Sequence, residues 1–72
     1  MNPKQAVQRM LEKSGKSKSS VSLALGKHRN FVVSSMMREP WNPALSTIVG
    51  IAHECGYAVV LERNGEKIVI DE

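Results

Sequence analysis

The stretch that decides the fold runs from Ser17 to Val32 and reads SKSSVSLALGKHRNFV. Ser17 is one of the residue types preferred at a helix N-cap, and Val21 and Leu25 are spaced to lie on one face of the helix that follows. Gly26 ends this helix after about eight residues, because glycine adopts the backbone conformations that close a helix. A helix this short is unstable alone in water, so it must pack against a neighbour.

A second short helix is expected directly after the glycine. The connection is a glycine-led turn of about three residues, and His28 or Arg29 opens the helix, which ends near Arg38. Val32 is the inward residue of this helix, and Ser22 is the small residue where the two helices cross. Two short helices joined by such a turn are typical of a helix-turn-helix motif.

The residues before this stretch predict a helix over about residues 3–14. Asn2 at the cap, Pro3 at the first helical position and Gln5 form a capping-box start. Apolar side chains then recur at helical spacing, and Gly15 is a natural C-terminal cap. The expected inward stripe consists of Ala6, Val7, Met10, Leu11 and Ser14.

A fourth helix is predicted in the second half of the chain. Asn42-Pro43 repeats the cap-plus-proline start, and Gly56 ends the helix. Cys55 is expected to pack in this helix as a small apolar residue, because free cysteine behaves as a small hydrophobic side chain. The expected inward face consists of Leu45, Ile48, Ala52 and Cys55, with Val49 and Ile51 on its shoulders.

From Tyr57 onward the apolar pattern changes from helical to strand-like and predicts a β-hairpin that ends near Asp71. Asn64-Gly65 is the preferred two-residue turn, since both positions adopt positive φ at low cost. That turn fixes the register, and the two pairs nearest to it join opposite charges across the strands. The predicted cross-strand pairs are Arg63 with Glu66, Glu62 with Lys67, Leu61 with Ile68, Val60 with Val69 and Val59 with Ile70.

Both faces of this hairpin are apolar near its base, although a hairpin that lies on helices needs only one apolar face. A lone two-stranded ribbon also leaves two open edges. We therefore expect a homodimer, with a hairpin sandwiched between its own helices as the alternative. The sequence leaves open whether the dimer forms through the hairpin or through the fourth helix. The expected dimerisation residues of the hairpin are Val59, Val60, Leu61, Ile68, Val69 and Ile70.

The composition indicates one small globular domain, with a helical part over residues 1–56 and the hairpin over residues 57–72. Of the 72 residues, 42% are hydrophobic and 24% are charged, which is typical of a folded domain. The single cysteine excludes an internal disulfide, and the longest stretch without Asp, Glu, Lys or Arg, from Pro40 to His53, is too short to span a bilayer. The N-terminus lacks the apolar run of a signal peptide, so we expect a cytoplasmic protein with no membrane partner.

Charge is distributed unevenly between the two halves of the chain. Residues 1–38 carry eight basic residues against Glu12, a net charge of +7, whereas residues 39–72 carry two basic residues against six acidic ones, a net charge of −4. A basic half beside an acidic half is what an anionic partner on one side requires. A solvated surface whose charges happen to segregate is the alternative. We interpret the basic half as functional.

Three segments together resemble the phage-repressor and Cro-type helix-turn-helix family, also called XRE or lambda-repressor-like. They are residues 17–32, residues 42–48 (NPALSTI) and residues 51–56 (IAHECG), and the similarity covers about residues 4–56. The resemblance implies a mainly α fold, with a four-helix lambda-repressor-like helix-turn-helix domain followed by the C-terminal β-hairpin. The sequence departs from the family pattern at Lys18, Ser22, Lys27 and Ser35, and Met36 and Met37 are expected to take over the packing at the last position.

The resemblance implies that the third helix enters the major groove of DNA with its N-terminal residues at the base edges. The side chains suit this task, because Arg29 can pair with guanine, Asn30 with adenine, and Val33 can contact a thymine methyl. A phosphate contact by Arg29 and a helix-capping role for Asn30 are the alternatives. The expected base contacts are His28, Arg29, Asn30, Val33 and Ser34. The expected DNA backbone contacts, for which a solvated surface is the alternative, are Lys16, Ser17, Lys18, Ser19, Lys27 and Arg38.

The sequence offers no residue set for catalysis, a metal or a cofactor. His53 and Cys55 are two apart on a helix and point in different directions, and Trp41 is expected in the core rather than as a stacking platform. We expect a non-enzymatic, sequence-specific double-stranded DNA-binding transcriptional regulator that acts as a homodimeric repressor. One alternative is the antitoxin of a toxin–antitoxin pair, with a toxin as protein partner. The other is a helix-turn-helix module that binds only proteins.

Overall fold

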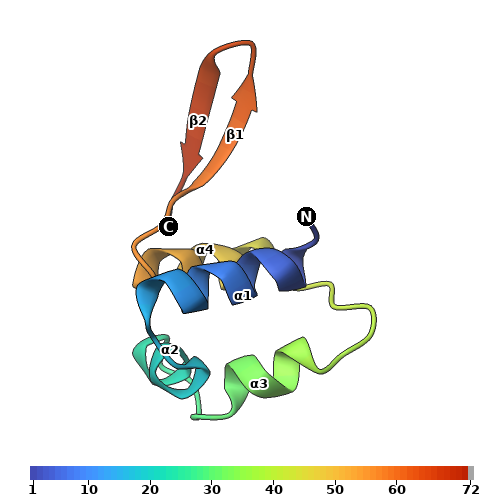
Figure 1. The fold of residues 1–72 in the computed structure, drawn as a ribbon, viewed down its shortest axis with the longest axis vertical. Coiled ribbons are helices and arrows are strands. Elements are labelled where there is room, and N and C mark those ends of the chain that lie inside the picture. The colour runs from blue at the N-terminus through green and yellow to red at the C-terminus, as the bar shows by residue number, and fades with distance from the viewer. Residues whose placement is uncertain (72) are drawn as a thin grey trace.

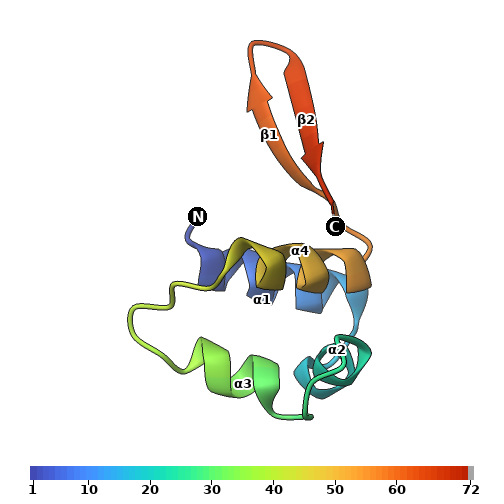
Figure 2. The ribbon, with the colours of Figure 1, turned by 180° about the vertical axis from the view of Figure 1, so that it is seen from behind.

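Four helices and a two-stranded hairpin make up the computed structural model, which describes residues 1–71. Helices α1 and α4 lie side by side, α2 and α3 lie across from them, and the hairpin projects from the opposite side (Figure 1). The view from behind shows the same arrangement (Figure 2). The chain is a small, mainly helical domain with a projecting antiparallel hairpin. The elements are α1 (Pro3–Ser14), α2 (Lys18–Ala24), α3 (Phe31–Met36), α4 (Leu45–Glu54), β1 (Val59–Arg63) and β2 (Glu66–Ile70).

Helix α1 has the bounds that its capping signals predict. The Gln5 N–H donates to Asn2 Oδ1 at 2.8 Å, and the Asn2 N–H donates to Gln5 Oε1 at 3.1 Å, which completes the capping box. Gly15 closes the helix in the left-handed conformation, with φ of 72°. Ser17 then starts α2, because its Oγ accepts a hydrogen bond from the Ser20 N–H at 3.0 Å.

Helix α2 ends in a Schellman motif, in which two backbone hydrogen bonds close a helix around a left-handed residue. The Gly26 N–H donates to the Leu23 carbonyl at 3.0 Å, and the Lys27 N–H donates to the Ser22 carbonyl at 3.1 Å. Gly26 supplies the left-handed residue, with φ of 75°. The helix covers seven residues, close to the predicted length.

The bounds of α3 differ from the prediction. The helix has six residues and begins at Phe31, whereas the sequence predicted a start at His28 or Arg29 and an end near Arg38. The reason is that the Schellman motif occupies the first half of the connection, so the chain needs further residues to turn into α3. One bond of this second turn joins the Phe31 N–H to the His28 carbonyl at 3.0 Å. The connection is therefore residues 25–30 rather than a three-residue turn.

Helix α4 begins at Leu45 with Ala44 as its N-cap, so the prediction of a cap at Asn42-Pro43 is wrong. The segment before the helix contains no regular structure. The buried Trp41 side chain anchors this segment to the core.

The inward face of α4 is also shifted relative to the prediction. Ile51 is fully buried rather than at the shoulder, and Val49 and Ala52 are buried with it. Leu45, predicted to point inward, is 55% exposed. The later start of α4 explains the difference, because it places Leu45 in the first turn, at the end of the helix.

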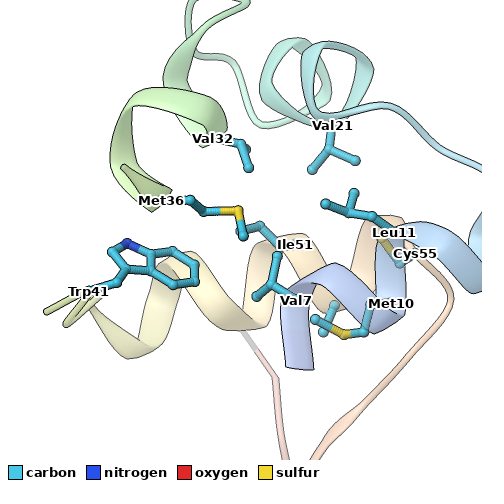
Figure 3. Close-up of a cluster of buried hydrophobic side chains, with 10 residues drawn as sticks. Val7, Met10, Leu11, Val21, Val32, Met36, Trp41, Ile51 and Cys55 are labelled. Carbon is cyan, nitrogen blue, oxygen red and sulfur yellow. The ribbon is translucent and has the colours of Figure 1, made fainter. Parts of the chain in front are cut away.

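One apolar cluster between the four helices forms the core (Figure 3). Val21 and Val32, the predicted inward residues of α2 and α3, are both buried, and Cys55 packs in the cluster as predicted. The cluster of buried residues consists of Val7, Met10, Leu11, Val21, Val32, Met36, Trp41, Ile51, Ala52 and Cys55.

Trp41 is a core residue, as predicted, and its indole carries one polar group into the core. Its Nε1 donates a hydrogen bond to Ser35 Oγ at 2.8 Å, so the last turn of α3 is tied to the segment that precedes α4. Met36 is buried beside them, but Met37 is 76% exposed. Only Met36 therefore takes over the packing that both methionines were expected to provide.

The hairpin has the predicted register. Asn64 and Gly65 form the turn with φ of 47° and 88°, as expected for a two-residue turn with two positive φ angles. Lys67 and Glu62 lie opposite each other, with Lys67 Nζ 3.8 Å from Glu62 Oε2. The five cross-strand pairs are Val59 with Ile70, Val60 with Val69, Leu61 with Ile68, Glu62 with Lys67 and Arg63 with Glu66.

Only the base of the hairpin contacts the helices. Val59 packs against the helical core, whereas Leu61 and Ile68 are 55% and 51% exposed, and Val60 and Val69 on the other face are 40% and 57% exposed. A hairpin sandwiched between its own helices, the alternative that the sequence left open, is therefore wrong. Within residues 1–71, no helix is both long and apolar enough to cross a membrane.

Candidate nucleic-acid interface

The hydroxyl of Ser22 joins α2 to the start of α3. Ser22 is fully buried, and its Oγ donates to the Lys18 carbonyl at 2.7 Å and accepts from the Val32 N–H at 3.0 Å. Val32 is the second residue of α3, and the first N–H groups of a helix have no carbonyl partner within it. This hydroxyl therefore satisfies a buried donor and fixes where α3 begins relative to α2.

The connection between α2 and α3 places three of the predicted base contacts before the helix rather than on it. His28, Arg29 and Asn30 are all exposed and lie within residues 25–30. Asn30 occupies the N-cap position of α3, but its side chain makes no capping hydrogen bond. Its backbone carbonyl starts the helix instead, by accepting from the Ser34 N–H at 2.9 Å. The capping role that the sequence left open for the Asn30 side chain is therefore not used.

Phe31 organises the second half of the connection. Its ring is half-buried against the core and meets the His28 ring edge-on, with centroids 6.3 Å apart and an interplanar angle of 86°. Lys27 Nζ lies 5.5 Å from the centroid of the same ring. The aromatic ring therefore gathers two polar side chains of the connection. This role of Phe31 was not predicted from the sequence, although an aromatic residue directly after a basic turn was a usable signal.

The remaining two predicted base contacts lie on α3 itself. Val33 is 37% exposed and Ser34 is exposed, so both side chains are accessible to a partner. The connection and α3 lie at the end of the molecule opposite the hairpin (Figure 1). The structure thus brings all five predicted base contacts into one continuous segment, residues 28–34.

The predicted DNA backbone contacts fall into three groups. The first surrounds the start of α2, where Lys16 and Ser19 are exposed and Lys18 is half-buried. The Ser17 hydroxyl there accepts the N-cap hydrogen bond, so its oxygen has a structural role as well. The second group is Lys27 in the connection and the third is Arg38 after α3, and both side chains are exposed.

One basic side chain of α1 forms an ion pair within the molecule. Lys4 on α1 forms an ion pair with Glu39, which lies after α3. This contact joins the start of α1 to the segment that leads to α4. Lys4 was not among the predicted contacts, and its pairing removes it further from that role.

Two further features of the surface bear on binding chemistry. Among residues 1–71, no group of three or more His, Cys, Asp or Glu side chains is placed to hold a metal ion. A groove of about 670 Å³ lies between the base of the hairpin, the C-terminal end of α2 and α4. This groove was not predicted from the sequence, because it depends on the angle at which the hairpin leaves α4.

Comparison of the chain with protein-family models, curated proteins and solved structures found no match.

Proposed function

We propose that this protein is a sequence-specific double-stranded DNA-binding transcriptional regulator that acts as a homodimeric repressor. In this proposal α2, the connection and α3 form a helix-turn-helix of the phage-repressor type, and residues 28–34 enter the major groove. The observation that carries the proposal is the exposed pair Arg29 and Asn30 in a backbone segment fixed at both ends. The Schellman motif at Gly26 fixes one end and the Ser22 hydroxyl fixes the other.

The chemistry of these side chains favours base reading over a purely ionic contact. Arg29 presents a planar guanidinium that can donate two hydrogen bonds to guanine O6 and N7, and Asn30 can pair with adenine N6 and N7. Val33 offers an apolar contact for a thymine methyl. A segment that combined only lysines would attract DNA without distinguishing its bases.

The surrounding basic groups supply the contacts to the DNA backbone. Lys16 and Lys18 flank the start of α2, Lys27 lies in the connection, and Arg38 follows α3. Contacts of this kind position a protein on the duplex and make its binding depend on salt. In the proposal they set the register in which Arg29 and Asn30 meet the bases.

The test is selection of bound duplexes from a random library at near-physiological salt. A repressor dimer is expected to enrich a palindrome whose half-sites lie about ten base pairs apart. Arg29→Lys serves as the matched variant, because it keeps the charge and loses the bidentate geometry. Enrichment that persists unchanged in this variant would contradict the assigned reading residue. Binding without any enrichment would contradict sequence-specific regulation and favour the protein-binding module.

A further inference from the structure

The two faces of the projecting hairpin differ in composition. The first, here called the Leu61 face, carries Val59, Leu61, Arg63, Glu66, Ile68 and Ile70, because directly paired residues lie on the same side of the ribbon. The second, here called the Val60 face, carries Val60, Glu62, Lys67 and Val69. The Leu61 face has four large apolar side chains against two on the other. The two apolar side chains of this face that lie nearer to the hairpin tip, Leu61 and Ile68, are each more than half exposed.

The Leu61 face continues into the groove at the hairpin base. Val59 and Ile70 line this groove together with Leu25 of the connection, Val49 and Gly50 of α4, and Tyr57. Apolar side chains therefore extend from the Leu61 face to α4, and the same groove is also lined by Val69 of the other face and by His53, Glu54 and Asp71. A soluble monomer rarely leaves a surface of this kind uncovered, because its exposure to water is unfavourable.

We propose that the Leu61 face packs against the Leu61 face of a second copy of this chain, around a twofold axis that runs along the hairpin. The inference rests on the proposed function, which already expects a dimer. It adds which face of the hairpin forms the dimer and how the twofold axis is oriented. Two sheets in a sandwich pack about 10 Å apart with their strands nearly aligned. In this arrangement β1 of one copy covers β2 of the other, so Leu61 meets Ile68 and Val59 meets Ile70.

The charges at the hairpin tip complement each other under the same symmetry. Arg63 and Glu66 are directly paired within one hairpin and lie on the Leu61 face. Around the proposed axis, Arg63 of each copy faces Glu66 of the other, and two ion pairs form at the tip. A second copy is therefore matched to this face in charge as well as in apolar character.

The position of the proposed DNA interface favours this axis over pairing at an open strand edge. Residues 28–34 lie at the end of the molecule opposite the hairpin (Figure 1). An axis along the hairpin keeps both copies of this segment at the same end, where they can meet two half-sites of one duplex. Antiparallel pairing through an edge of β1 or β2 would instead point the two hairpins in opposite directions and separate the two segments.

Two neighbouring residues of β2 give a matched test of the face. Ile68 and Val69 point to opposite faces and are 51% and 57% exposed, so Ile68→Thr and Val69→Thr each put a hydroxyl in place of exposed apolar surface on one face, and Ile68→Thr removes one methyl group more. Both variants keep a β-branched residue that suits a strand. By sedimentation equilibrium, Ile68→Thr is expected to weaken the dimer by about tenfold or more, as for a central interface residue, while Val69→Thr leaves it unchanged. The reverse order, or equal loss in both variants, would overturn the proposal.

Charge reversal at the tip tests the symmetry independently of hairpin stability. Arg63→Glu gives a hairpin with two acidic tip residues, and Glu66→Arg gives one with two basic tip residues, so each variant alone has like charges within and between copies. Mixed together, the two variants keep their internal repulsion but gain two attractive pairs between copies. Native mass spectrometry is expected to show mostly heterodimer after mixing. A statistical mixture of the three dimers, or only monomers in the unmodified protein, would overturn the proposal.

Failure of the proposed hairpin interface can be distinguished from failure of the proposed function. Neither measurement contains DNA, and the duplex selection requires only that residues 28–34 bind bases. Enrichment of a palindrome together with a statistical mixture of dimers would preserve the proposed function and overturn the hairpin interface. A heterodimer preference without any enriched sequence would preserve the interface and overturn the proposed function.

Discussion

Substitution of Ser22 by alanine tests whether a single hydroxyl holds α3 in place. The change removes the acceptor of the Val32 N–H, which lies 3.0 Å from Ser22 Oγ in the buried interior. The N–H cannot find a carbonyl within α3, because it belongs to the first turn of that helix. Leaving a buried donor without a partner costs about 1–3 kcal/mol. For a domain of this size, about 2 kcal/mol lowers the melting temperature by roughly 8–16 °C.

The assay is thermal unfolding followed by circular dichroism, with Ser20→Ala as the matched control. Ser20 lies on the same helix, but its side chain is exposed, so its loss is expected to change stability by no more than about 0.5 kcal/mol. At temperatures where Ser22→Ala remains folded, its preference for the selected duplex is expected to fall, because the start of α3 is no longer fixed. If Ser22→Ala and Ser20→Ala unfold at the same temperature, the reasoning about this hydrogen bond is wrong.

Three further predictions concern the site, the hairpin turn and the anchor after α3. Arg29→Ala and Asn30→Ala are each expected to lose about 1–3 kcal/mol of binding to the selected duplex, with little change on a scrambled one, in titrations of both duplexes. Equal loss on the two duplexes would refute base reading. Gly65→Ala forces a side chain into a left-handed conformation and is expected to cost about 1–2 kcal/mol, visible as faster amide hydrogen exchange confined to the hairpin. Trp41→Phe removes the donor to Ser35 and is expected to cost about 1 kcal/mol in thermal unfolding, and an unchanged melting temperature would show that this bond does not stabilise the fold.

The parts of the fold that the sequence predicted correctly depend on local signals. The capping box at Asn2 and the glycine at position 15 determine both ends of α1 within a few neighbouring residues. The Asn64-Gly65 turn likewise determines the register of the whole hairpin, because a two-residue turn permits only one pairing of its strands. Neither prediction needed information about residues distant in the chain.

Two parts of the fold were predicted wrongly. One depends on the kind of turn that a local signal produces, and the other depends on contacts with residues distant in the chain. Gly26 was recognised as the end of α2, but its Schellman motif consumes residues that the prediction had assigned to α3. The cap signal at Asn42-Pro43 is equally good in isolation, yet α4 begins only at Leu45, because Trp41 holds the preceding segment against the core. That anchoring depends on Ser35 and on side chains from other helices.

The residues of the candidate site remain a prediction, and the structure shows that the backbone around them differs from the predicted helix. The five side chains predicted to contact bases are all exposed, but the first three of them belong to a turn rather than to a helix. The side chains of Arg29 and Asn30 therefore do not follow helical spacing. Which bases they could reach depends on the turn, and the turn depends on Gly26 and on the Phe31 ring beside it. None of these dependencies is visible in a helical pattern.

Two serine hydroxyls fix the position of α3, the short helix proposed to lie in the major groove. A helix as short as α3 has too few internal hydrogen bonds to be stable alone, so its position must come from tertiary contacts. Ser22 binds the backbone at its start, and Ser35 binds the Trp41 indole at its end. Both contacts are directional hydrogen bonds, which fix the rotation and the axial position of α3 more narrowly than apolar contacts do.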